Sequence, residues 1–115
     1  WVVLSACNTG AADGEGAEAV SGMGRAFFYA GCRALLVSMW PVETSSARQL
    51  TTRVFQYQKG DQSLSRADAL RKSILDLIEG PGIKDPGSGR IAASYAHPFF
   101  WAPFIIMGDS GRNLN

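Results

Sequence analysis

The sequence predicts an α/β fold in three layers, in which about three parallel strands are flanked by helices. Short apolar runs occupy residues 2–6, 33–39 and 104–107, as expected of strands that are buried on both faces. Between the first two runs, residues 15–30 carry apolar and small side chains at helical spacing. A strand, a helix and a strand in succession form a βαβ unit, whose two strands run parallel through a right-handed crossover.

The helices follow from periodicity and capping residues. In the first helix, one face is formed by Val20, Gly24, Phe27 and Phe28, and Gly31 follows as a C-terminal stop. A second helix should begin after an N-cap at Thr44 or Ser45 and run to about Gln58. We expect its inward face to consist of Ala47, Leu50, Val54 and Phe55.

Gly60 and Asp61 end the second helix, and a third helix opens soon afterwards. Residues 65–68 (Ser-Arg-Ala-Asp) resemble a capping box in which Asp replaces Glu. The apolar face of this third helix contains Leu70, Ile74, Leu77 and Ile78. Glycine and proline predict a loop over residues 81–93. Residues 95–101 are aromatic and irregular, and they lead into the third strand.

Composition restricts the classes of function. The chain has 115 residues, is 46% hydrophobic and has a net charge of +1, which fits one small globular domain rather than a disordered chain. Its balanced charge gives no basic surface for nucleic acid. No apolar run reaches the roughly 18 residues that span a bilayer. We therefore expect neither nucleic acid nor membrane as a partner.

Histidine and cysteine are scarce. His97 is the only histidine, and the two cysteines, Cys7 and Cys32, are too far apart for a zinc-binding pattern. We therefore expect no metal and no cofactor. Two cysteines do not make a disulfide scaffold, which favours a reducing compartment and hence the cytoplasm.

The first residues indicate a piece of a longer domain. Trp1 leads directly into a strand, with neither an initiator methionine nor the basic region of a signal peptide. Three strands are few for a sheet covered on both sides, and an open edge invites pairing with further strands. We expect the rest of the sheet to come from the N-terminal half of the same domain.

Cys7 is the strongest candidate for chemistry. It stands at the carboxyl end of the first predicted strand and enters a turn that contains Gly10. Sites in open α/β sheets form at this edge, and N–H groups of such a turn can stabilise an oxyanion. On position alone, a buried cysteine that acts as a small apolar residue remains the alternative.

Four stretches resemble the CHAT domain, a caspase-like family in the clan that includes caspases and separases. Residues 4–10 (Leu-Ser-Ala-Cys-Asn-Thr-Gly) resemble the caspase-type nucleophile signature, with Ser5 in place of Gln. Residues 22–34 resemble the helix after the nucleophile, and residues 35–43 resemble the next strand and its W-x-V turn. Residues 97–109 resemble the family's closing strand.

The resemblance implies a caspase-like fold and a cysteine endopeptidase with a Cys–His dyad, acting on a protein or peptide substrate. Cys7 would be the nucleophile, and the histidine lies upstream of it in the family. No histidine precedes Cys7 here, so we expect the isolated piece to be inactive. Tetratricopeptide repeats often accompany the family and are a possible partner domain. A non-catalytic protein-interaction module with the same fold is the alternative function.

Substrate selection is assigned to residues that follow the second predicted strand or lie near Cys7. In related peptidases the S1 pocket is partly lined by residues that correspond to 39–44 here. Glu43 would favour a basic P1 side chain, whereas Trp40 with Met39 would favour an apolar one. Asp13, together with Glu15, is a second acidic candidate near Cys7. Each carboxylate could instead be a solvated loop charge or a charge at a helix N-terminus.

Three further interpretations carry less weight. His97 as the base is less favoured than a packing or hydrogen-bonding histidine, and Cys32 is expected to be buried and inert. A Cys7–Cys32 disulfide is disfavoured because the intervening helix separates the two residues. Residues 14–19 (Gly-Glu-Gly-Ala-Glu-Ala) match a dinucleotide-binding pattern. However, their first glycine stands too far from the strand for that fold.

Overall fold

The computed structural model describes residues 1–4 and 15–111, without the side chains of residues 15–21. The chain forms two compact units. The first unit comprises Trp1–Val42 and Pro103–Ser110, and the second comprises Glu43–Ala102 and Gly111–Asn115.

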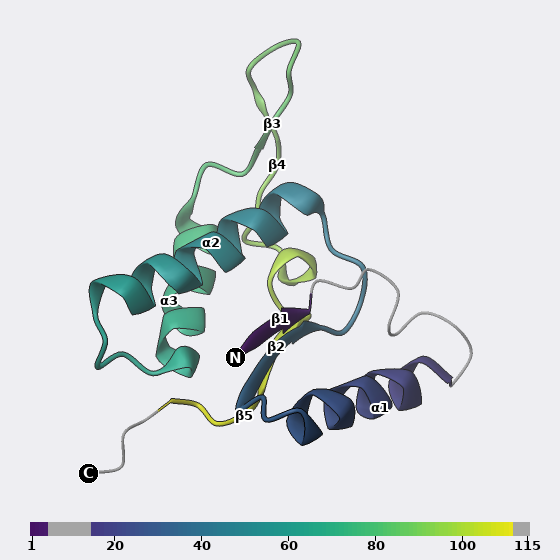
Figure 1. Ribbon diagram of the computed structural model, residues 1–115. Helices are drawn as coiled ribbons and strands as arrows, with labels where there is room; N and C mark the ends of the chain where they lie inside the picture. Colours follow the sequence, from purple (N-terminus) through teal and green to yellow (C-terminus); the bar gives the residue numbers. More distant parts are fainter. Residues whose placement is uncertain (5–14, 112–115) are drawn as a thin grey trace. The chain divides into compact units, whose positions relative to one another are not determined.

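The first unit contains a three-stranded sheet in the order β1-β2-β5 (Figure 1). Strand β1 (Val2–Leu4) pairs in parallel with β2 (Ala34–Ser38), and Leu4 lies opposite Val37. All five residues of the central strand β2 are buried. The parallel pair confirms the predicted βαβ unit, in which the apolar run of β2 is explained by burial on both faces.

Helix α1 (Glu15–Tyr29) connects the two parallel strands, and it ends as its sequence predicts. Gly31 has a φ of 90°. Its N–H donates to the Phe28 carbonyl at 3.0 Å, and the next N–H, of Cys32, donates to the Phe27 carbonyl at 2.9 Å. These two bonds form a Schellman motif, which requires a left-handed residue at this position. Gly24 is buried, and a Cβ there would lie 3.6 Å from Leu35 Cδ1, so α1 packs on β2.

The direction of the third strand differs from the prediction. Strand β5 (Phe104–Gly108) pairs with β2 in antiparallel fashion, with Ser38 opposite Phe104. The sheet is therefore mixed, with one parallel pair, and the prediction of three parallel strands was wrong for β5. The Met39 N–H donates to the Pro103 carbonyl at 2.9 Å, so the chain returns to the sheet at the end where it left β2. An apolar run encodes burial but not strand direction.

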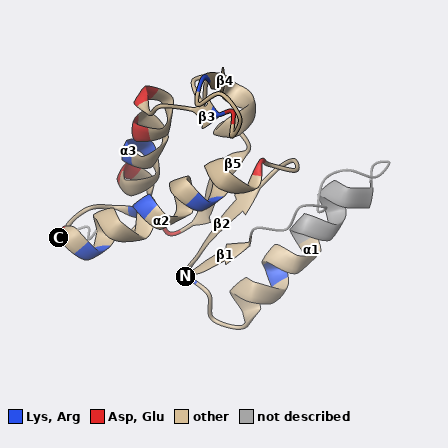
Figure 2. Cartoon of the chain, turned by 90° about the horizontal axis from the view of Figure 1, so that it is seen from above, with Lys and Arg blue, Asp and Glu red and all other residues tan. Residues whose placement is uncertain are grey.

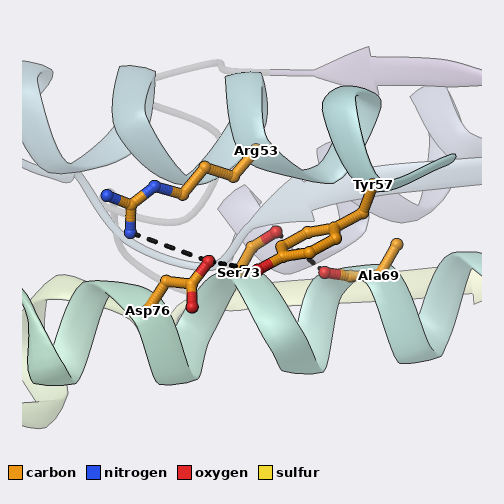
Figure 3. A network of polar contacts seen from close by, with 5 residues as sticks. All are labelled: Arg53, Tyr57, Ala69, Ser73 and Asp76. Carbon is orange, nitrogen blue, oxygen red and sulfur yellow. Dashed lines mark hydrogen bonds and ion pairs between the residues drawn. The ribbon is translucent and has the colours of Figure 1, made fainter. Parts of the chain in front are cut away.

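The second unit is built on two helices, α2 (Thr44–Gly60) and α3 (Arg66–Glu79). They run in opposite directions alongside each other (Figure 3). Their buried residues are Ser46, Ala47, Leu50 and Val54 on α2 and Ala69, Leu70, Ser73 and Leu77 on α3. Phe55 was predicted to face inward, but it is 47% exposed. It directly follows the buried Val54, and consecutive residues of a helix point to different sides.

Residues 81–93, predicted as a loop, contain a short antiparallel hairpin (Figure 1). Strand β3 (Ile83–Lys84) pairs with β4 (Ile91–Ala93). At its base, Gly82 has a φ of 76°, and a Cβ there would lie 2.3 Å from the Ala93 carbonyl oxygen. At its tip, the Asp85 carboxylate accepts hydrogen bonds from the backbone N–H groups of Gly87 and Ser88, both at 3.2 Å. The glycines that suggested a loop are therefore the turn residues of a hairpin.

The aromatic segment is anchored by local contacts. Tyr95 is 3% exposed, and its ring meets that of Phe100 edge to face at 5.1 Å. A single turn of 3₁₀ helix, η1 (Pro98–Phe100), follows His97. This segment leads into β5.

Candidate active site at the carboxyl edge of the sheet

The two parallel strands end at the same edge of the sheet. Leu4 ends β1 opposite Val37, one residue before the end of β2. Cys7 follows Leu4 by three residues along the chain, and Met39 and Trp40 directly follow β2. Cys7 and Asp13 lie outside the described residues. Trp40, a candidate S1 residue, therefore follows a strand that ends at this edge.

Met39 and Trp40 are accessible at this edge. Their side chains are 44% and 38% exposed, respectively, although each follows a strand whose residues are all buried. The adjoining Ser38 is only 3% exposed, and its Oγ is buried and makes no hydrogen bond to the residues that the structure describes. This hydroxyl could not be singled out from the sequence, because a serine within an apolar strand gives no signal of its hydrogen bonding.

Glu43 is the N-cap of α2, where Thr44 or Ser45 was predicted. Its Oε1 accepts the Ser45 N–H at 2.8 Å, and its Oε2 accepts the Ser46 N–H at 2.7 Å. The Tyr95 hydroxyl also donates to Oε2, at 3.5 Å. The carboxylate thus satisfies two N–H groups that a helix N-terminus otherwise leaves unpaired.

The pKa of Glu43 reflects these contacts. Burial acts to raise the pKa, but it is outweighed by hydrogen bonds from the Ser46 and Ser45 N–H groups, the Ser46 side chain and the Tyr95 hydroxyl. The pKa therefore lies below its ordinary value of 4.5. An ionised carboxylate is also stabilised by the positive end of the helix dipole. Both of its oxygens are engaged within the second unit, whereas Trp40 belongs to the first unit.

His97 makes a local hydrogen bond. Its Nδ1 accepts the Phe99 N–H at 3.2 Å and thereby caps η1. The side chain is exposed. The interpretation of His97 as a hydrogen-bonding histidine is confirmed.

Cys32 is a free cysteine that is half-buried rather than fully buried. Its Sγ lies 2.9 Å from the Ala34 carbonyl oxygen, to which the thiol donates. The weighed Cys7–Cys32 disulfide involves a residue outside the described ones. Within residues 1–4 and 15–111, no group of three or more His, Cys, Asp or Glu side chains could hold a metal ion. No described helix is both long and apolar enough to cross a membrane.

A comparison with models of protein families identifies the family of this chain. The sequence model of the CHAT domain matches residues 1–109. The chain belongs to the CHAT domain family. A search of curated proteins found no match, nor did a search of solved structures.

Membership confirms the resemblance found in the sequence. It relates this CHAT domain to a caspase-like peptidase family. The match includes Cys7 and the segment around Trp40, and it continues through β5. Within the residues that match the CHAT domain, the candidate site is at the edge of the mixed sheet of the first unit.

Proposed function

We propose that this CHAT domain is the nucleophile-bearing part of a caspase-like cysteine endopeptidase, with Cys7 as the nucleophile. The observation that carries the proposal is the family match across residues 1–109. Cys7 occurs within it in the sequence Ser-Ala-Cys-Asn-Thr-Gly, three residues along the chain from the end of the first strand of the parallel pair. In an open α/β sheet this edge is where sites form.

The proposed reaction is acyl transfer through a Cys–His dyad. The Cys7 thiolate attacks the scissile carbonyl carbon, and N–H groups of the following turn stabilise the oxyanion of the tetrahedral intermediate. The intermediate collapses to a thioester as the imidazolium protonates the leaving amine. Water then attacks the thioester, with the imidazole as general base, and releases the acid and the thiol.

In the proposed mechanism, the general base is a histidine that is not among these 115 residues. His97 is the only histidine of the chain, and its Nδ1 already accepts the Phe99 N–H. A histidine from the N-terminal part of the same domain would complete the dyad. The isolated chain should therefore have no peptidase activity.

For the S1 pocket, the accessible side chains of Trp40 and Met39 support a preference for an apolar P1 residue. Glu43 remains an acidic candidate for a basic P1 residue, but its two carboxylate oxygens already accept backbone hydrogen bonds. Asp13 is the other acidic candidate. Because the Glu43 carboxylate is already hydrogen-bonded, an apolar P1 residue is favoured over a basic one.

A non-catalytic interaction module is the second candidate, supported by the lack of a base within the chain. The two functions differ in the segment before the first strand. A peptidase needs a strand there that ends in His-Gly, and a module does not.

Covalent labelling of the full-length protein tests the peptidase proposal. A peptidyl acyloxymethyl ketone should label the protein at Cys7 alone, as read by mass spectrometry of its peptides. Cys7→Ser should abolish the label. Cys32→Ser is the matched control and should retain it, because the Cys32 thiol is half-buried and donates to Ala34. Labelling at Cys32, or at no cysteine, would contradict the proposal and favour the module.

A further inference from the structure

A polar hollow of about 550 Å³ opens between α2 and α3, entirely within the second unit. Its lining residues are Arg53, Gln56, Tyr57, Asp76, Glu79 and Gly80. Nothing in the proposed peptidase reaction uses this place. Volumes of this size are typical of ligand sites, and the charged lining indicates the chemistry of the ligand.

Asp76 is contacted by two of the other lining residues. Arg53 and Tyr57 extend from α2 toward its carboxylate on α3 (Figure 3). The Tyr57 hydroxyl donates to Asp76 Oδ2 at 2.5 Å, a short distance typical of a hydrogen bond to an ionised acceptor. A carboxylate accepts several hydrogen bonds, so Asp76 keeps acceptor capacity beyond its contact with Tyr57.

Arg53 does not form a close ion pair with Asp76. Its Nη1 lies 4.0 Å from Asp76 Oδ2, beyond hydrogen-bonding distance. The same nitrogen is buried and makes no hydrogen bond within the described part of the chain. A buried charged donor without an acceptor is unfavourable. The guanidinium is thus drawn to the carboxylate by charge but is held at a distance where it cannot form the bidentate pair that arginine prefers.

The rest of the lining attracts positive charge. Glu79 adds an exposed carboxylate at the end of α3. The carboxyl end of a helix carries partial negative charge, and the last turn of α3 contains no basic residue to compensate it. Lys72 Nζ lies 5.5 Å from the centre of the Tyr57 ring, a cation–π distance. Among the lining residues, two carboxylates and a helix end thus accompany one guanidinium, and the Lys72 ammonium lies beside them on the Tyr57 ring.

We propose that the hollow between α2 and α3 binds a basic side chain, arginine or lysine, of a protein partner. The incoming guanidinium or ammonium pairs with the Asp76 carboxylate and with Glu79. Arg53 is an internal competitor for the same carboxylate, and binding moves it away. The Gln56 amide at the rim has one acceptor and two donors, which match the peptide bonds on either side of a basic residue. This proposal does not rest on the peptidase function.

Calorimetry on the full-length protein tests it, with Cys7→Ser present so that cleavage cannot interfere. The probe is acetyl-Gly-Arg-Gly-amide, and its control is the citrulline peptide, which has the same shape without the charge. The arginine peptide should bind about tenfold more tightly than the citrulline peptide, because the site is selected by charge. Glu79→Gln should weaken the binding about fivefold, since it removes one exposed charge pair.

The decisive variant is Arg53→Gln, which should strengthen binding of the arginine peptide by removing the competitor. Arg48→Gln is its matched control, because Arg48 is exposed on the same helix outside the hollow, and it should leave the affinity unchanged. Equal effects of Arg53→Gln and Arg48→Gln on the affinity would show that binding depends only on the net charge of the protein, and this would overturn the proposal. Equal binding of the two peptides, or no binding to either wild type or Arg53→Gln, would also overturn it. Circular dichroism of each variant verifies the fold.

Discussion

Glu43 shows how one residue can satisfy a sequence pattern and serve another purpose in the fold. Its place after the W-x-V turn suggests a substrate pocket, yet its carboxylate caps α2 through the Ser45 and Ser46 N–H groups. Thr44 and Ser45 have the side chains that usually cap helices. Their residue types therefore predict the cap, and only the backbone path shows which residue precedes the first helical turn.

We predict that Glu43→Ala lowers the free energy of unfolding by about 1 kcal/mol at neutral pH, the usual cost of losing an N-cap. Thr44→Ala is the control and should have little effect, because Thr44 is exposed and follows the cap. The pKa of Glu43 is lowered in the fold, so its contribution is present above pH 4.5 and is lost as the pH falls through that lowered pKa. Urea denaturation of both variants at several pH values measures this. A larger loss for Thr44→Ala would contradict the capping assignment.

At the scale of elements, periodicity and capping predicted the helices well. The third helix begins after Ser65, whose Oγ accepts the Asp68 N–H at 3.0 Å and donates to the Asp68 carboxylate at 2.7 Å. The first of these contacts is the one that the Ser-x-x-Asp spacing predicts, whereas the Asp68 carboxylate accepts from the Ser65 hydroxyl instead of the backbone N–H of a capping box. Such signals are local, because the residues that interact are three or four positions apart.

Contacts between elements were not predictable in the same way. Tyr57 and Asp76 are 19 residues apart, and nothing in either helix indicates that they meet. The hairpin over residues 83–93 was missed for a related reason, since its strands are too short to show an alternating pattern.

We predict that the Tyr57–Asp76 contact makes stability depend on alkaline pH. The hydrogen bond with Asp76 is the main cause that raises the pKa of Tyr57 above 10.0. Because the folded pKa is the higher one, the contribution is present below pH 10.0 and is lost as the pH rises through the folded value. Tyr57→Phe should therefore be less stable than wild type at pH 8, and the difference should vanish at high pH.

Chemical denaturation at neutral and at alkaline pH measures this effect. Tyr29→Phe is the matched control: the Tyr29 side chain is 91% exposed, so its loss of a hydroxyl should leave stability unchanged at either pH. A constant difference between wild type and Tyr57→Phe across the pH range would refute the role of the contact.

At the scale of the whole molecule, the central strand β2 connects a parallel partner on one side with an antiparallel partner on the other. Its leucines Leu35 and Leu36 are fully buried. Strand β5, by contrast, is at an edge of the described sheet, and its Ile105 is 38% exposed. The sheet is therefore most sensitive to change at its centre.

We predict that Leu36→Ala costs about 2–5 kcal/mol of unfolding free energy, as expected for a large-to-small substitution in a core. Ile105→Ala, its control on the edge strand, should cost less than half as much, because part of that side chain is already in water. Urea denaturation followed by circular dichroism compares the two. Similar losses would show that β2 is not the centre of the core.

The amino-acid sequence by itself determined the family, the three helices, the parallel βαβ pair and Cys7 as the candidate nucleophile. Each of these depends on residues that are close in sequence or on a motif of fixed spacing. The tertiary structure alone decided the antiparallel direction of β5, the use of Glu43 as a cap and the charged hollow around Asp76. These depend on where the backbone returns and on which distant side chains it brings within a few ångströms, and residue type and spacing do not encode that.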